Sequence, residues 1–196
     1  MQGDLMKRLI IVLIFLSSFS AQAGENILSP MIGFTNWSDN TGHTARGNAI
    51  AFEDDNDLTF GFKYLYMFDS GFALGGNAFL YDKDVTTTFQ ANDAGVIHIH
   101  ALAEYFFNPT GSVSPFIGGG IGVTGIGFSG GILDEEGTGG ESIEFNGGVL
   151  FRLSKRVGFM IEYKYIDFDV DEDIDGFATN IESESQSLLF SATIHL

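Results

Sequence analysis

Apolar and polar side chains alternate with a period of two residues along most of this chain, and no other feature constrains the fold as strongly. A period of two is the repeat of a β-strand, whose successive side chains point to opposite faces. In residues 58–68, LTFGFKYLYMF, every even-numbered residue is leucine or aromatic, whereas the odd-numbered ones include Gly61 and Lys63. The alternation predicts an all-β fold of eight strands. The expected strands are 26–37, 58–68, 72–81, 96–107, 115–128, 143–152, 157–168 and 188–196.

Two of these segments leave a question open. In residues 26–37 the pattern does not show which face points inward. In the glycine-rich segment 115–128, Gly118, Gly120 and Gly122 either leave free space inside a closed sheet or make room for large neighbouring side chains.

The first 23 residues have the three regions of a secretory signal peptide. Lys7 and Arg8 give a basic start, residues 9–19 form an apolar run, and Ala-Gln-Ala at 21–23 is a small-x-small cleavage site. The alternative is a membrane anchor, but the run is shorter than the roughly 18 residues that a spanning helix needs. We therefore predict that residues 1–23 are removed and that residues 24–196 form one exported domain.

The charge of the chain excludes one class of partner. The whole sequence has 26 acidic and 9 basic residues, and residues 1–23 hold one acid and two bases, so the predicted mature domain keeps 25 acids and 7 bases, a formal charge of −18. Phosphate binding needs clustered Lys and Arg, so no nucleic-acid partner is expected. The absence of cysteine excludes disulfides, and the 20 phenylalanines exclude a disordered acidic chain.

The links between the expected strands alternate in length. Short links, DSG, NPTGSVS and SKR, follow the second, fourth and sixth strands, and the other four links run over a dozen residues each. An even number of antiparallel strands of about ten residues, with short periplasmic turns and long external loops, is typical of an outer-membrane barrel. We therefore predict an eight-stranded antiparallel up-and-down transmembrane β-barrel with short periplasmic turns and long acidic extracellular loops.

The rival fold is a soluble secreted barrel or sandwich, which would expose a well-charged second face. That face instead holds glycine, alanine, small polar residues and a few charges, which suits a narrow lumen filled by side chains. The charged residues expected in the lumen are Lys63, Glu104, Glu144, Arg152, Glu162 and Lys164. The tyrosines expected in aromatic girdles at the lipid interfaces are Tyr64, Tyr66, Tyr105, Tyr163 and Tyr165.

One stretch carries a resemblance to a known superfamily. Residues 101–127, ALAEYFFNPTGSVSPFIGGGIGVTGIG, combine a strand ending in aromatics, a short Pro/Gly turn and a glycine-rich strand. This resembles the small eight-stranded outer-membrane β-barrels of Gram-negative bacteria, of the OmpA transmembrane domain, OmpX and OmpW kind. The resemblance implies a monomer in the cell outer membrane, in contact with membrane lipid and lipopolysaccharide. Leu196 departs from the pattern, because such barrels usually end in an aromatic residue, and no separate peptidoglycan-binding domain is expected.

Residues 171–182, DEDIDGFATNIE, repeat the ligand order of a helix-flanked calcium loop. If Ca²⁺ binds there, Gly176 makes the sharp turn. The metal ligands would be the side chains of Asp171, Asp173 and Asp175, the carbonyl of Phe177, Thr179 through water, and Glu182 as a bidentate ligand. The flanking helices are missing and Ala178 replaces the usual branched apolar residue, so a solvated acidic loop without bound metal is the interpretation we favour. No other cofactor is expected.

His98 and His100 share the expected lumen face with Glu104. This spacing is compatible with metal ligands or an acid/base pair. We favour the simpler interpretation, in which they fill the lumen and bond to Lys63 or to a neighbouring strand. No serine stands beside a histidine in a motif of the barrel hydrolases, acyltransferases or proteases, so the chain is not expected to be an enzyme.

Three functional classes follow from these observations. We favour a surface-exposed structural or interaction protein whose acidic loops meet host molecules, phage or the lipopolysaccharide layer. The alternative is a narrow pore or carrier for small solutes. A lipid-modifying barrel enzyme is the least favoured class.

Overall fold

The computed structural model describes residues 24–37, 41–44, 49–52, 56–87, 91–129, 137–174 and 177–196. Ten β-strands lie in these ranges, and no helix in them is long and apolar enough to cross a membrane. The strands are β1 (Gly24–Trp37), β2 (Thr41–Thr44), β3 (Ala49–Phe52), β4 (Asp57–Phe68), β5 (Phe72–Thr87), β6 (Ala91–Phe106), β7 (Val113–Ser129), β8 (Gly137–Arg152), β9 (Val157–Ile174) and β10 (Phe177–His195).

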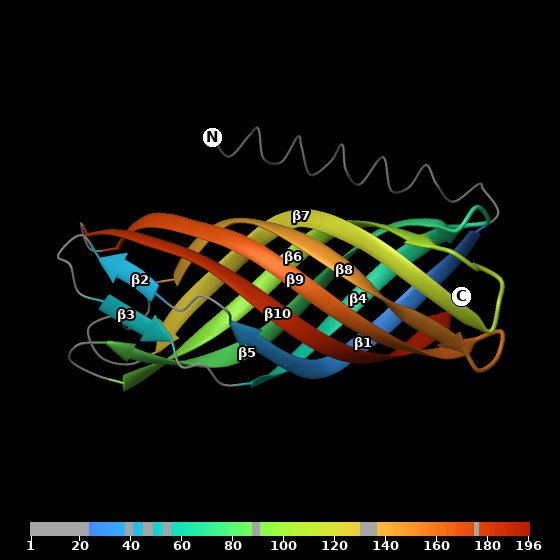
Figure 1. Cartoon of the computed structure of the whole chain (residues 1–196), viewed down its shortest axis with the longest axis horizontal. Helices are drawn as coiled ribbons and strands as arrows, with labels where there is room; N and C mark the ends of the chain where they lie inside the picture. Colours follow the sequence, from blue (N-terminus) through green and yellow to red (C-terminus); the bar gives the residue numbers. More distant parts are fainter. Residues whose placement is uncertain are drawn as a thin grey trace.

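Eight of these strands close into an antiparallel up-and-down barrel (Figure 1). The ladder runs in chain order from β1 through β4 to β10, and β1 pairs with β10 to close it, for example at Phe34 and Leu188. This confirms the predicted eight-stranded fold. The short strands β2 and β3, in a segment expected to be a loop, pair with each other and extend the wall between β10 and β5 at one end.

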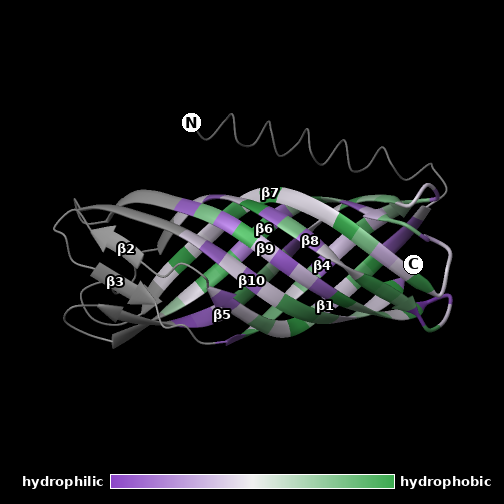
Figure 2. Ribbon diagram, in the orientation of Figure 1, coloured by the Kyte–Doolittle hydropathy of each residue, from purple (hydrophilic) through white to green (hydrophobic). Residues whose placement is uncertain are grey.

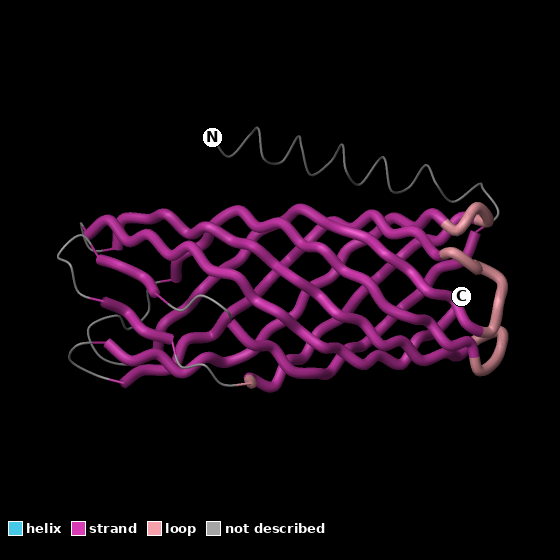
Figure 3. Tube along the Cα trace, viewed as in Figure 1, coloured by secondary structure: helices cyan, strands magenta, loops and turns pink. Residues whose placement is uncertain are grey.

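The three short links of the chain lie together at the other end of the barrel (Figure 3). They are residues 69–71, 107–112 and 153–156, and the last residue, Leu196, lies at the same end. In the tightest link, Gly71 has a φ of 88°, a conformation that favours glycine. Its NH donates to Phe68 O, at 2.9 Å. The remaining links fall largely outside the described residues, so the length and acidity of the loops there stay predictions.

An apolar band covers the outside of the barrel (Figure 2). On β4, the outward residues from Leu58 to Phe68 are all apolar or tyrosine and span about 25 Å along the axis, at about 3.3 Å per residue and a tilt of about 40°. That height matches the apolar band of an outer-membrane barrel. At the end with the short links, the ring pairs Tyr66–Phe68 and Tyr105–Phe107, with centroids 5.0 and 5.3 Å apart, contain two of the five tyrosines expected in aromatic girdles.

Polar residues border the band at the end opposite the short links. Asp82, Glu141, Asp167 and Asp169 point outward there and are exposed. The strands continue past this border, because β9 and β10 have 18 and 19 residues and extend about 45 Å at the same tilt. This explains why β10 starts eleven residues before the strand expected at 188. Beyond the lipid, outward positions need not be apolar, so the alternation fades.

Candidate functional site

The interior of the barrel is filled by three successive layers of side chains. An inner cluster of apolar residues lies toward the short links, and an outer apolar cluster lies toward the far end. The inner cluster is Ile27, Leu65, Met67, Ala73, Leu102, Phe106, Phe116, Leu150 and Met160. The outer cluster is Met31, Trp37, Phe79, Tyr81, Ala94, Val96, Ile126, Ile166, Phe168 and Leu189. Between them lies a charged layer, formed by Lys63, Glu104, Glu144, Glu162 and Lys164 with Asn77, His100 and Asn146.

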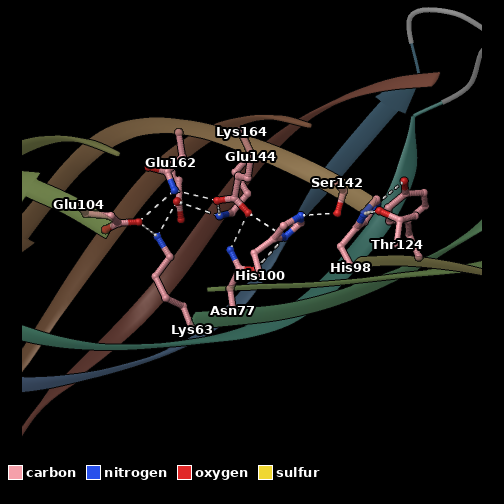
Figure 4. A network of polar contacts seen from close by, with 12 residues as sticks. Lys63, Asn77, His98, His100, Glu104, Thr124, Ser142, Glu144, Glu162 and Lys164 are labelled. Carbon is pink, nitrogen blue, oxygen red and sulfur yellow. Dashed lines mark hydrogen bonds and ion pairs between the residues drawn. The ribbon is translucent and has the colours of Figure 1, made fainter. Parts of the chain in front are cut away.

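The charged side chains of this layer form one connected network of ion pairs (Figure 4). Lys63 Nζ lies 2.8 Å from Glu104 Oε1 and 2.5 Å from Glu162 Oε1. Lys164 Nζ lies 3.0 Å from Glu162 Oε1 and also pairs with Glu144. All five side chains are fully buried. Charges of this kind are tolerated away from water only when they are paired and hydrogen-bonded.

Amide and imidazole groups complete the layer around Glu144. Asn77 Nδ2 donates to Glu144 Oε2 at 2.8 Å, and Asn146 Nδ2 donates to Glu144 Oε1 at 2.7 Å and to Glu104 Oε1 at 3.0 Å. His100 Nδ1 faces two acceptors, Glu144 Oε2 at 3.2 Å and Asn77 Oδ1 at 3.3 Å, so this nitrogen carries the proton. Its Nε2 lies 2.9 Å from the hydroxyl of Ser142, which can donate or accept.

The outer cluster contains a buried chain of hydrogen bonds. Trp37 Nε1 donates to the hydroxyl of Tyr81 at 2.8 Å, and that hydroxyl lies 3.0 Å from His98 Nε2. His98 Nδ1 lies 2.7 Å from Thr124 Oγ1. The chain joins β1, β5, β6 and β7 and satisfies the polar atoms of an otherwise apolar cluster. These hydrogen bonds link four strands toward the outer end of the lumen.

The three residues that the sequence placed on one face as a candidate site bond to different groups, although the rings of His98 and His100 stack with centroids 5.9 Å apart. Glu104 pairs with Lys63, His98 bonds to Tyr81 and Thr124, and His100 bonds to groups on β5 and β8. The histidines thus bond to neighbouring strands, as favoured, but neither of them bonds to Lys63. Among the residues that the structure describes, no group of three or more His, Cys, Asp or Glu side chains is placed to hold a metal ion.

The glycines of β7 make room for large neighbours. A Cβ on Gly118 would lie 2.5 Å from Glu104 Cγ, and a Cβ on Gly120 would lie 2.6 Å from Leu102 Cδ2. At Gly122 it would lie 2.7 Å from the Cα of His100. At these three positions β7 has no side chains because β6 occupies the interior there. Of the two interpretations that the sequence left open, the glycines therefore make room for large neighbours rather than leave free space.

A smaller ionic cluster closes the end with the short links. Arg152 Nη2 lies 3.1 Å from Glu25 Oε2, and His195 Nδ1 lies 2.9 Å from Glu25 Oε1. Arg152 Nη1 also donates to Ser114 Oγ at 2.8 Å. Glu25 of β1 thus joins β8 and β10 across the mouth, next to the seam that closes the barrel. Arg152 was expected in the lumen, whereas Glu25 was not identified because the first strand was expected to begin at residue 26 and β1 begins at Gly24.

Replacing Glu25 with glutamine is expected to lower barrel stability by about 1 kcal/mol or less, because the side chain is 29% exposed and water screens both contacts. The measurement is the urea midpoint of the refolded protein in detergent. Asp69→Asn, an exposed carboxylate in a short link at the same end, serves as the control and should leave the midpoint unchanged. A Glu25→Gln midpoint equal to that of the control would show that the cluster contributes nothing.

The segment 171–182 lies partly within described strands. The backbones of Asp171 and Asp173 belong to β9, and those of Phe177, Thr179 and Glu182 belong to β10, in register as Asp171 with Asn180 and Asp173 with Ala178. Asp175 and Gly176, and the side chains of the whole segment, lie outside the described residues. The calcium site therefore stays a prediction.

Three solved structures share the fold of this chain. Neisserial surface protein A has 12% sequence identity and a TM-score of 0.64, with 88% of this chain and 99% of that chain covered. OprG from Pseudomonas aeruginosa has 16% identity and a TM-score of 0.61, with 89% and 97% covered. Ail from Yersinia pestis, solved with the heparin analogue sucrose octasulfate, has 17% identity and a TM-score of 0.53, with 89% and 100% covered. At these identities the similarity shows the fold alone.

Comparison with curated protein sequences finds no match. A family model described as "outer membrane protein beta-barrel domain" matches residues 9–182, which is most of the chain. The closed eight-stranded barrel, the apolar outer band and the filled lumen agree with that match. The chain belongs to the outer membrane protein beta-barrel domain family and is located in the outer membrane.

Proposed function

We propose that this protein is a surface-exposed structural or interaction scaffold, in which the barrel holds external loops at the cell surface. The observation that carries the proposal is the filled interior. Two apolar clusters lie on either side of a layer of paired charges, and the side chains of all three layers are buried. Eight strands enclose a space that side chains can just fill. The strands that extend beyond the apolar band would carry the loops away from the lipid.

The partner class follows from charge. The family membership suggests partners at the cell surface, such as host molecules, phage or lipopolysaccharide. The sucrose octasulfate in the Ail structure is a polyanion, but the net charge of −17 of the present chain disfavours a polyanionic partner that binds without cations. We therefore propose cationic protein surfaces, or anionic surfaces bridged by divalent cations, as the partners of a monomeric barrel.

We also propose that the protein is not an enzyme. Release of fatty acid from labelled lipopolysaccharide would contradict this proposal.

The scaffold and the alternative pore differ in conductance. In a planar lipid bilayer, the refolded protein is expected to produce no stepwise current, because the outer and inner clusters block both ends of the lumen. A porin reconstituted in the same way is the positive control. Discrete channel openings that survive repurification would support the pore and contradict the scaffold.

Calcium binding at 171–182 is tested separately, by isothermal titration of the folded barrel. As a site, the segment would take up one Ca²⁺ saturably, and Asp173→Ala and Glu182→Ala would each abolish the uptake because each removes a ligand. As a solvated acidic loop, which we favour, it would show weak uptake that none of these changes removes. The matched control is Asp69→Ala, which removes an acid at the opposite end of the barrel.

A further inference from the structure

An apolar groove of about 430 Å³ lies in the outer wall of the barrel, over β6, β7 and β8. Ile97 and Ile99 of β6 and Val123 of β7 form its apolar walls, and Gly125 and Gly139 form its floor. Glu141 of β8 stands at its edge. All six residues belong to the outward face, so the groove opens away from the lumen and toward whatever surrounds the barrel.

The groove exists because outward side chains are missing at register positions that face one another. Ile97 pairs with Gly125, and Gly125 pairs with Gly139. One step further from the short links, Gly95, Gly127 and Gly137 lie in one row. A Cβ on Gly127 would meet no atom within 4 Å, which shows that the wall is open there.

The height of the groove identifies its occupant. Its apolar walls belong to the band that faces lipid, and Glu141, paired with the exposed Asp169, belongs to the polar border of that band. The border lies opposite the short links, which in this family of folds are periplasmic, so the groove lies in the outer leaflet. The species that faces an apolar recess there is a lipid acyl chain, and the lipid of that leaflet is lipopolysaccharide.

We propose that this groove is a fixed binding site for one acyl chain of lipid A. The bare backbone of Gly125 and Gly139 lets the chain lie against the sheet, and the side chains of Ile97, Ile99 and Val123 hold it from the sides. The exposed carboxylates beside the groove would repel the lipid A phosphates unless a divalent cation bridges them, so the site is expected to require Mg²⁺ or Ca²⁺ in the medium.

Native mass spectrometry of the refolded barrel, with purified lipid A and Mg²⁺, tests the site. The expected result is one lipid A retained on the wild-type protein under conditions that remove phosphatidylethanolamine. Gly139→Leu should lower the retained fraction about tenfold, because its side chain takes the place of several methylene contacts. Gly147→Leu is the matched control, since Gly147 lies on the same strand and outward face but does not line the groove.

Each outcome decides the proposal. Equal retention by Gly139→Leu and Gly147→Leu would overturn it, as would equal retention of phosphatidylethanolamine and lipid A by the wild-type protein. Ile97→Trp fills the groove from the β6 side and gives the same test if Gly139→Leu does not fold. Lipid A binding depends only on the place of the barrel in the outer membrane, so its failure would leave the scaffold role of the loops intact, and a conducting barrel would leave the groove intact.

Discussion

Replacing Lys63 with methionine is expected to destabilise the folded barrel by about 3–5 kcal/mol. The ammonium group of Lys63 pairs with Glu104 and Glu162, and all three side chains are fully buried. Methionine keeps most of the side-chain volume but leaves the Glu104 carboxylate without a cationic partner and Glu162 with Lys164 alone. The measurement is the free energy of unfolding in urea, with the fraction that migrates as a folded, heat-modifiable band as a second readout.

Two further variants separate loss of the ion pair from loss of positive charge. Lys155→Met removes an exposed lysine in the short link 153–156 and should leave stability unchanged. The double change Lys63→Met with Glu104→Met replaces a buried pair by apolar groups and should recover part of the loss, since such replacements are often neutral or stabilising. A double variant less stable than Lys63→Met alone would contradict the view that the unpaired Glu104 charge causes the loss.

Replacing Gly122 with valine is expected to prevent formation of the folded barrel or to destabilise it by at least about 3 kcal/mol. A Cβ at this position would lie 2.0 Å from the carbonyl oxygen of Ile99 and 2.7 Å from the Cα of His100. Both atoms belong to the backbone of the paired strand β6, so no side-chain rotation relieves the clash. The folded fraction after refolding into detergent, measured by mobility on an unboiled gel, reports the effect.

The same strand provides the control for this change. Gly127→Val introduces the same side chain on the opposite face of β7, where a Cβ meets no atom within 4 Å, and should fold like the wild-type protein. Equal folding of the two variants would mean that the interior beside Gly122 has room to spare, in favour of the pore. Failure of both would point to the loss of glycine flexibility rather than to packing.

Much of the fold could be predicted from the sequence because a lipid-facing strand leaves a simple pattern. The even-numbered residues of 58–68 must be apolar to face lipid, so the alternation alone assigned Lys63 to the lumen, and the same reasoning assigned Glu104, Glu144, Glu162 and Lys164. The pattern was less informative in 26–37, where Ser29 and Thr35 share the inward face with Ile27 and Trp37. There both faces hold apolar residues, and Trp37 was missed as a member of the outer cluster.

The partners inside the barrel could not be predicted, because alternation fixes a face but not a neighbour. Lys63 pairs with Glu104, which is 41 positions later in the sequence, and with Glu162, which is 99 positions later. Such contacts depend on strand register and on how the tilted strands stagger around the axis. The same limit explains why His98, His100 and Glu104, two to six residues apart on one face, bond to different groups.

The sequence by itself determined that this chain is a membrane barrel with a few charged residues in its lumen, because lipid forces every second residue of a crossing strand to be apolar. Only the tertiary structure decided which side chains meet inside the lumen, since that depends on how distant strands stagger around the barrel. It also decided where the outer wall is recessed. The groove over β6, β7 and β8 arises from glycines on neighbouring strands that come into line only when the register is set.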